Sequence, residues 1–193
     1  MSYNEMLKPV LDDLESKEVE IAGGSAVGMI LSITNSLIGY ICNLTIGKKN
    51  YESVQEEVVN IKKEVDELKK EALIIIDKDK VVLEKILGGY KIRKENPEEF
   101  ERINKEAVIF CLDVTKNAFE TLKLADRISK VGNRMLSSDF EICKDYAFAS
   151  IKASIVNVKI NLKSIQNEEF KNDIEKRYNE IYEEAKKIIS QDL

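Results

Sequence analysis

The sequence of 193 residues contains no histidine and no tryptophan, and it has only 2 prolines and 8 glycines. The absence of histidine excludes a Ser-His-Asp triad, a Cys-His dyad, a Glu-x-x-His di-iron centre and every His-ligated zinc site. Any acid–base chemistry near neutral pH must therefore use a carboxylate, a lysine, a cysteine, a tyrosine or the substrate itself.

Cysteine is also scarce, and basic residues are fewer than acidic residues. The three cysteines, Cys42, Cys111 and Cys143, are far apart and form no C-x-x-C pair, which is typical of reduced thiols in a cytoplasmic protein. The N-terminus lacks the basic-then-apolar pattern of a signal peptide, so we expect a cytoplasmic location. Acidic residues outnumber basic residues by 35 to 30, for a net charge of −5, which argues against a nucleic-acid partner.

One segment, residues 21–47, has no charged residue and is followed directly by Lys48 and Lys49. Its length and flanking charges would suit a transmembrane helix. However, the remaining chain is amphipathic and needs a core of its own, which a bundle wrapped around this helix would provide. The segment also carries seven polar residues, so we favour a buried central helix over a membrane span: Ser25, Ser32, Thr34, Asn35, Ser36, Asn43 and Thr45.

Nearly all of the chain has helical periodicity, and no alternating strand pattern occurs. Asn96 and Pro97 form a strong helix start, and Gly132 suits the residue after a helix end. We predict an all-α fold, a single helical bundle of about six helices in one domain covering residues 1–193. The expected helices cover residues 3–15, 24–46, 51 to beyond 86, 97–131, 138–163 and 168–190.

The third predicted helix has one residue that breaks its apolar pattern. A heptad seam of apolar residues is interrupted by Asp79, and the flanking seam positions are Val54, Val58, Ile61, Val65, Leu68, Ala72, Ile75, Val82 and Ile86. A core-facing carboxylate costs several kcal/mol unless it is paired, hydrated or protonated. Asp79 is therefore either a buried residue satisfied by a lysine or a helix cap, or a functional acid or base. Asp77 points away from the seam and is expected to be solvated.

The central helix has a face with little side-chain bulk, formed by Gly24, Gly28, Ser32, Ser36, Gly39 and Asn43. One interpretation is close helix packing, within the chain or across a dimer axis. The other is a groove for a flat ligand, in which the segment Gly23, Gly24 and Ser25 offers helix N-terminal N–H groups to an anion.

Three further polar groups have two interpretations each. Ser150, Ser154, Asn157 and Asn161 line one helical face, which suits either a heterocyclic ligand or a polar seam between helices. Near Gly132 and Asn133, Ser138 or Asp139 is either a helix N-cap without any function, which the spacing favours, or a functional residue. Lys48 and Lys49 form a basic turn that is either solvated or meets an acidic substrate tail.

Six short segments of the chain, in order, match known motifs. They are residues 22–26 (AGGSA, motif P-G-G-G-S-A), 43–51 (NLTIGKKNY, motif N-L-T-x-G-K-K-x-Y), 77–79 (DKD, motif D-x-D), 89–94 (GYKIRK, motif A-Y-K-L-P-K), 132–139 (GNRMLSSD, motif G-N-x-x-x-x-S-D) and 157–162 (NVKINL, motif N-V-x-I-N-L). Together these segments resemble the cyclodeaminase/cyclohydrolase family acting on folates, which includes the C-terminal domain of formiminotransferase-cyclodeaminase and stand-alone bacterial methenyltetrahydrofolate cyclohydrolases.

The resemblance implies a role for each matching position. The second Asp of D-x-D is the family's catalytic carboxylate, and it corresponds to Asp79. The resemblance further implies one-carbon folate chemistry that needs neither metal nor cofactor, in a homodimer with no nucleic-acid or membrane partner. The residues then expected to bind the folate substrate are Gly23, Gly24, Ser25, Lys48, Lys49, Asn133, Ser138, Asp139, Asn157 and Asn161.

The sequence departs from the family pattern at Ile21, at Ala22, at Arg93 and in the bulky residues 80–83 after Asp79. Three functions therefore stay open. The first is hydrolysis of methenyltetrahydrofolate by a carboxylate base. The second is formimidoyltetrahydrofolate cyclodeaminase activity, in which ammonia leaves as the ring closes. The third is a non-catalytic helical module of the same fold.

Overall fold

Six α-helices, two short 3-10 helices and no strand make up residues 2–17 and 21–190, which a computed structural model describes. The all-α prediction is confirmed. The elements are α1 (Tyr3–Glu15), α2 (Gly23–Asn43), η1 (Lys49–Val54), α3 (Gln55–Ile92), α4 (Pro97–Val131), η2 (Arg134–Leu136), α5 (Ser137–Leu162) and α6 (Glu168–Ser190).

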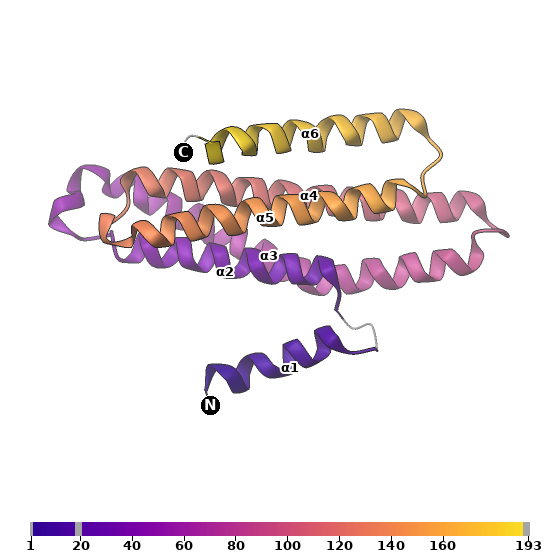
Figure 1. Cartoon of the computed structure of the whole chain (residues 1–193), viewed down its shortest axis with the longest axis horizontal. Coiled ribbons are helices and arrows are strands. Elements are labelled where there is room, and N and C mark those ends of the chain that lie inside the picture. The colour runs from indigo at the N-terminus through magenta and orange to yellow at the C-terminus, as the bar shows by residue number, and fades with distance from the viewer. Residues whose placement is uncertain (1, 18–20, 191–193) are drawn as a thin grey trace.

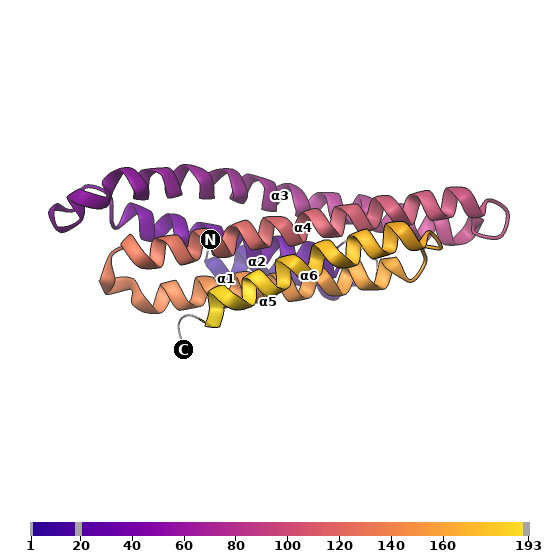
Figure 2. The same cartoon turned by 90° about the horizontal axis from the view of Figure 1, so that it is seen from above.

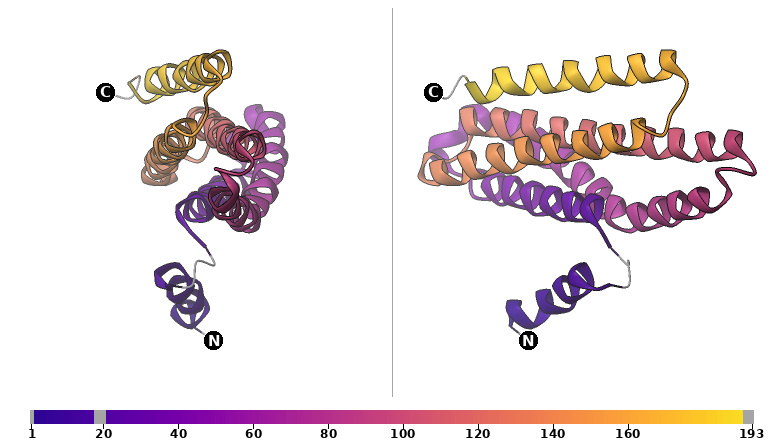
Figure 3. Two further views of the ribbon diagram at one scale, coloured as in Figure 1. Left: turned by 90° about the vertical axis from the view of Figure 1, so that its right-hand side faces the viewer. Right: turned by 45° about the vertical axis from the view of Figure 1, so that its right-hand side comes forward.

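Helices α2 to α5 form an up-and-down bundle in which consecutive helices run antiparallel (Figure 1). The longest helices, α3 and α4, have 38 and 35 residues and extend beyond α2 and α5 at one end (Figure 2). Seen along the bundle axis, α6 packs on the outer side of α4 and α5, whereas α1 stands apart on the side of α2 (Figure 3).

Local sequence signals account for several helix boundaries. The Asn96 side chain accepts a hydrogen bond from the Glu99 N–H at 3.1 Å, so the predicted start of α4 is confirmed. Gly47 follows α2 with a φ of +76°, which favours glycine. The prediction that Ser138 or Asp139 caps α5 is wrong. That helix begins at Ser137, and the residue before it, Leu136, has no side-chain oxygen to offer the backbone.

The apolar seam of α3 faces the bundle core as predicted. Val58, Ile61, Val65 and Ala72 are fully buried, and the seam packs against α2 and α4. Gly28 allows α2 to approach α3 closely, because a Cβ there would lie 3.1 Å from the Ala72 carbonyl oxygen. The small-residue face of α2 thus packs against α3 of the same chain at Gly28.

Helix α2 is long and apolar enough, by length and composition, to cross a membrane, but it also suits the centre of a bundle. Of its most apolar 18-residue stretch, 56% is buried inside the protein. Its outer side carries the exposed apolar residues Ile30, Ile33 and Tyr40 and no charge. The inner side of α2 lies in the core, which confirms the prediction of a central helix on that side. On its outer side, an apolar strip is exposed.

Candidate active site

Asp79 lies where the first turn of α2 meets the middle of α3. Its Oδ2 atom accepts two hydrogen bonds from Ser25, one from the backbone N–H at 2.8 Å and one from the hydroxyl at 3.0 Å. The same hydroxyl lies 3.0 Å from the Ile76 carbonyl oxygen, one turn earlier on α3. The carboxylate is half-buried and accepts these bonds at the positive end of the α2 dipole. The anion at this helix N-terminus is therefore a side chain of the same protein.

Gly24 lets the Asp79 carboxylate approach the α2 backbone. A Cβ built on Gly24 would lie 2.0 Å from Asp79 Oδ1 and 2.5 Å from its carboxyl carbon, closer than any real contact. Gly23, by contrast, is exposed, and a Cβ there would meet nothing within 4 Å. The two adjacent glycines thus have different tasks: Gly24 makes room for Asp79, and Gly23 leaves the helix start open.

Cys111 on α4 and Asn161 on α5 complete the side of the bundle near Asp79. The Asn161 amide nitrogen lies 3.5 Å from the Cys111 sulfur. Burial raises the pKa of the Cys111 thiol to about 12; the Asn161 bond opposes this increase and the charge of nearby Asp79 adds to it. Asp79, Cys111 and Asn161 therefore lie at one level of the bundle, contributed by three different helices.

The predicted polar face of α5 divides into two parts. The hydroxyls of Ser150 and Ser154 are buried and donate to carbonyls of their own helix, those of Tyr146 and Ile151. Asn157 is half-exposed and lies one turn before Asn161 on the same side of the helix. Only the C-terminal part of this face, with its two asparagines, leads toward the level of Asp79.

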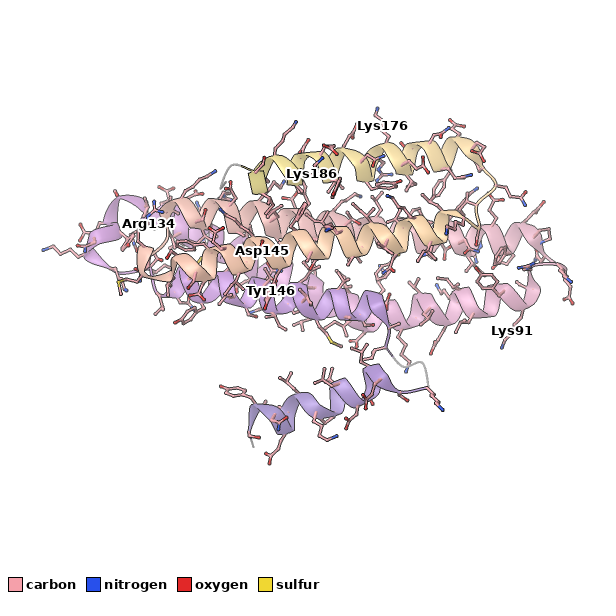
Figure 4. The ribbon with its side chains drawn as sticks, in the orientation of Figure 1. Lys91, Arg134, Asp145, Tyr146, Lys176 and Lys186 are labelled. Carbon is pink, nitrogen blue, oxygen red and sulfur yellow. The ribbon has the colours of Figure 1, made fainter. Side chains whose placement is uncertain are left out.

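Lys48 and Lys49 lie at the opposite end of α2, beside the loop between α4 and α5. They line an open pocket of about 610 Å³ together with Asn50, Tyr51, Asn133, Arg134 and Met135. Three cationic side chains around an open pocket favour an anionic ligand. Arg134, which the sequence analysis did not single out, is the third of these cations, and Figure 4 shows it at this end of the bundle.

Asn133 holds this loop in place. Its backbone N–H donates to the Thr45 hydroxyl at 3.0 Å, and its side-chain nitrogen donates to the Leu44 carbonyl at 3.3 Å. Its side-chain oxygen accepts from the Met135 N–H at 3.2 Å. Asn133 is only 4% exposed, so the geometry gives it the task of joining the end of α2 to the end of α4. Substrate contact by this residue stays a prediction.

Ser138 and Asp139 lie at the same end of the bundle, in the first turn of α5. Ser138 is exposed and Asp139 is half-buried. Burial raises the pKa of the Cys143 thiol to about 12, and the negative charge of Asp139 adds to that effect. Both residues therefore lie away from Asp79, at the end of the bundle that carries the pocket of Lys48, Lys49 and Arg134, which we call the basic pocket.

The predicted site residues thus form two groups rather than one. Gly23, at the start of α2, marks the Asp79 group, and Lys48 lies just beyond the helix's far end. Because α2 has 21 residues, the two groups are separated by roughly 30 Å along its axis. Helical periodicity could not reveal this separation, since it reports the side on which a residue lies and not its partners in other helices.

A second open pocket, of about 560 Å³, lies where α3 and α4 extend past α2. It is lined by residues including Tyr90 and Arg93 of the predicted 89–94 segment and Ser164, which follows α5. The Tyr90 and Ser164 hydroxyls are 3.4 Å apart. Within residues 2–17 and 21–190, no three His, Cys, Asp or Glu side chains lie together in a way that could hold a metal ion.

Comparison with known proteins identifies one family and several proteins that are similar to this chain. A family model described as Formiminotransferase-cyclodeaminase matches residues 6–180. A methenyltetrahydrofolate cyclohydrolase of Methylorubrum extorquens is 26% identical over 177 residues, which cover 88% of this chain and 85% of that protein. A formimidoyltransferase-cyclodeaminase of Gallus gallus is 25% identical over 174 residues, and the match spans only 32% of that longer protein.

A crystal structure of formiminotetrahydrofolate cyclodeaminase from Thermotoga maritima has the same architecture. It superposes with a TM-score of 0.84 at 26% sequence identity, and the match covers 96% of each chain. The fold predicted from periodicity therefore has a solved counterpart over almost its whole length.

Proposed function

The chain belongs to the formiminotransferase-cyclodeaminase family, and from this premise we propose that it hydrolyses 5,10-methenyltetrahydrofolate to 10-formyltetrahydrofolate with Asp79 as general base. The observation that supports this role is the Asp79 carboxylate, which Ser25 fixes at the open N-terminus of α2. The relative named methenyltetrahydrofolate cyclohydrolase, which matches over most of both chains, supports the choice of reaction.

In this mechanism the substrate supplies its own electrophile, the amidinium carbon between N5 and N10. Asp79 takes one proton from a water molecule as the water oxygen bonds to that carbon. The bond from the carbon to N5 then breaks, the second water proton leaves the new carbonyl oxygen, and Asp79 returns a proton to N5. Of the two protons of water, one ends on N5 and the other is released, so the cationic substrate becomes a neutral product.

The two hydrogen bonds from Ser25 give the base a fixed position. Both go to the same atom, Oδ2, so the carboxyl group is oriented from one side. A negative carboxylate would also attract the cationic ring, which places substrate and base together before the reaction. Asn157 and Asn161, on the neighbouring face of α5, are the residues we expect to orient the pterin.

The basic pocket of one chain would lie next to Asp79 of another chain if the two chains pair through α2. An antiparallel pair of α2 helices would set Asn43 of one chain near Gly23 of the other. The partner's Lys48 and Lys49 would then come next to Asp79, which bridges the separation of about 30 Å found within one chain. We therefore place the substrate between Asp79 of one copy and the partner's basic pocket, with the lysines facing the glutamate tail.

Cyclodeaminase activity is the second candidate, because the solved structure that matches 96% of this chain is named as such an enzyme. In that reaction N10 bonds to the formimino carbon, the bond from this carbon to the nitrogen breaks, and ammonia leaves. Asp79 would carry the proton from N10 to the departing nitrogen. The same carboxylate thus serves either reaction, and the substrate distinguishes them.

The test is the decay of methenyltetrahydrofolate absorbance with purified protein, compared with the spontaneous rate. Asp79→Asn keeps an oxygen that can accept from Ser25, so the variant should fold and lose the accelerated rate. The matched control is Asp77→Asn, which changes an exposed carboxylate two residues away and should keep full activity.

The outcomes separate the three functions. An accelerated rate that only Asp79→Asn abolishes supports the cyclohydrolase. No acceleration, but ammonia release from the formimino substrate, supports the cyclodeaminase. Neither activity, together with no folate binding by calorimetry, would leave a non-catalytic helical module.

A further inference from the structure

Helix α1 has an apolar face that no part of residues 2–17 and 21–190 covers. None of its residues is buried, and Met6, Leu7 and Leu11 are each more than half exposed. These residues share one face with Tyr3, Val10 and Leu14, at the three- and four-residue spacing of an amphipathic helix. An isolated helix of 13 residues with a proline inside is marginal in water, so α1 needs a surface to pack against.

The bundle also has an apolar surface that is exposed in the part of the chain that the structure describes. We call it the α2–α5 face, and define it by its exposed members Ile30, Ile33, Tyr40, Ile142, Tyr146 and Ile160. The first three lie on α2 and the others on α5, which packs beside α2. A helix at the surface of a soluble protein normally turns charged residues outward, and α2 has none to turn.

The two uncovered surfaces lie on the same side of the molecule without meeting. Figures 1 and 3 show α1 outside the bundle, alongside α2 and on the side away from α6. Burial agrees with this arrangement, because both the α1 face and the α2–α5 face stay exposed. One further layer of apolar surface between them would cover both.

A second copy of the chain fits this position better than a membrane does. Each chain carries one α1 face and one α2–α5 face, so a two-fold pair would cover both faces of both chains and leave none open. Helices that lie on membranes usually have a basic polar face. The polar residues of α1 are mainly acidic, with Glu5, Asp12, Asp13 and Glu15 against Lys8.

We propose that α1 is an exchanged arm, which packs its apolar face on the α5 members of the partner's α2–α5 face, beside the paired α2 helices, and clasps the dimer. The arm is joined to the start of α2, so it lies at the edge of the antiparallel α2 pair. This inference rests on the dimer described under the proposed function, and it assigns to residues 3–15 a task outside the catalytic machinery.

The first measurement is the dimer dissociation constant by sedimentation equilibrium. Leu7→Lys with Leu11→Lys places two charges on the apolar face of α1, and we expect dissociation to be about tenfold easier or more. Asp12→Lys changes the net charge by the same amount on the opposite face, where Asp12 forms an exposed ion pair with Lys8. This control should leave the dissociation constant unchanged.

The second measurement is cross-linking of a Leu11→Cys, Ile142→Cys double variant, because the antiparallel α2 pair brings the start of α2, which follows α1, next to the start of the partner's α5. The native thiols are buried and have pKa values raised to about 12 by that burial, so they should not compete. The expected product is a covalent dimer, which each single variant alone should form poorly.

Each outcome identifies which idea fails. A wild-type chain that sediments only as a monomer overturns the dimer and the arm together. If the chain is a dimer and the α1 substitutions do not change its dissociation constant, the exchanged arm is wrong and the dimer itself is supported. A cross-link confined to monomers shows that α1 covers its own bundle, and the exchange is then wrong.

Discussion

Gly24 and Asp79 lie so close together that no other residue fits at position 24 while the carboxylate stays where it is. The distance from an added Cβ to Asp79 Oδ1 would be 2.0 Å. The contact joins the first turn of α2 to the middle of α3, across 55 positions of sequence. It explains why a glycine, which weakens a helix, occurs in the first turn of this one.

This contact predicts a selective effect of Gly24→Ala. The clashing atoms belong to the end of the Asp79 side chain, so the carboxylate should move and the helices should stay in place. We expect the catalytic rate to fall about tenfold or more with little change in helix content, measured by the absorbance assay and circular dichroism.

Gly23→Ala is the matched control for that experiment. The added methyl group meets open space, and alanine favours the helix by up to about 1 kcal/mol. Activity should persist and the melting temperature should hold or rise. Equal losses of activity in both variants would show that the Asp79 contact is not the cause.

Ser25→Ala tests how Asp79 is held. The substitution removes the hydroxyl that donates to Oδ2 but keeps the backbone N–H bond, so the carboxylate should be less well fixed. We expect a partial loss of activity and a loss of about 1 kcal/mol of unfolding free energy.

Ser36→Ala provides the comparison for Ser25→Ala, since the Ser36 hydroxyl is exposed and donates to the Ser32 carbonyl of its own helix. Ser36→Ala should change neither the activity nor the unfolding free energy. A Ser25→Ala protein with wild-type kinetics would contradict the positioning of Asp79 by this side chain.

Mixing two inactive or weakened proteins tests the shared site. Asp79→Asn removes the base, and Lys48→Gln with Lys49→Gln weakens the basic pocket. If each site uses Asp79 of one chain and the lysines of the other, half of the chains pair as mixed dimers with one intact site each. The mixture should then recover about a quarter of the wild-type rate.

If instead each site lies within one chain, mixing creates no intact site. The rate would then equal the average of the two separate proteins. Refolding the variants together from denaturant, with each variant refolded alone as the reference, gives the comparison.

The buried thiols predict slow chemical modification. Burial raises the pKa values of Cys42, Cys111 and Cys143 from 9.0 to about 12. At pH 8 the thiolate fraction of each should be about a thousandfold lower in the folded protein than in the unfolded chain. Alkylation followed by mass spectrometry should therefore find no labelled cysteine until denaturant is added.

The same thiols predict how stability depends on pH. A raised pKa in the folded state contributes stability that is complete below the unfolded value, near 9, and is lost as pH rises toward 12. Unfolding free energy measured in urea should fall between pH 9 and pH 11. Cys143→Ala should reduce the slope, and an unchanged slope would contradict this origin.

The sequence by itself determined the helices, the capped start of α4 and the side of α3 on which Asp79 lies. These features follow from local rules, because periodicity fixes which residues share a helix face and caps fix where a helix begins. Resemblance to known motifs added the expected chemistry, and the family match confirmed the kinship.

Only the tertiary structure decided what Asp79 meets. Its partners Ser25 and Gly24 lie on another helix, and the rotation and offset of two helices depend on how their side chains pack together. The same packing placed Lys48 and Lys49 about 30 Å from Asp79 and gave Asn133 a place inside a loop. Residues that match motifs of one family in the sequence can therefore lie at opposite ends of a bundle, because the packing of the whole core sets which parts of the helices are in contact.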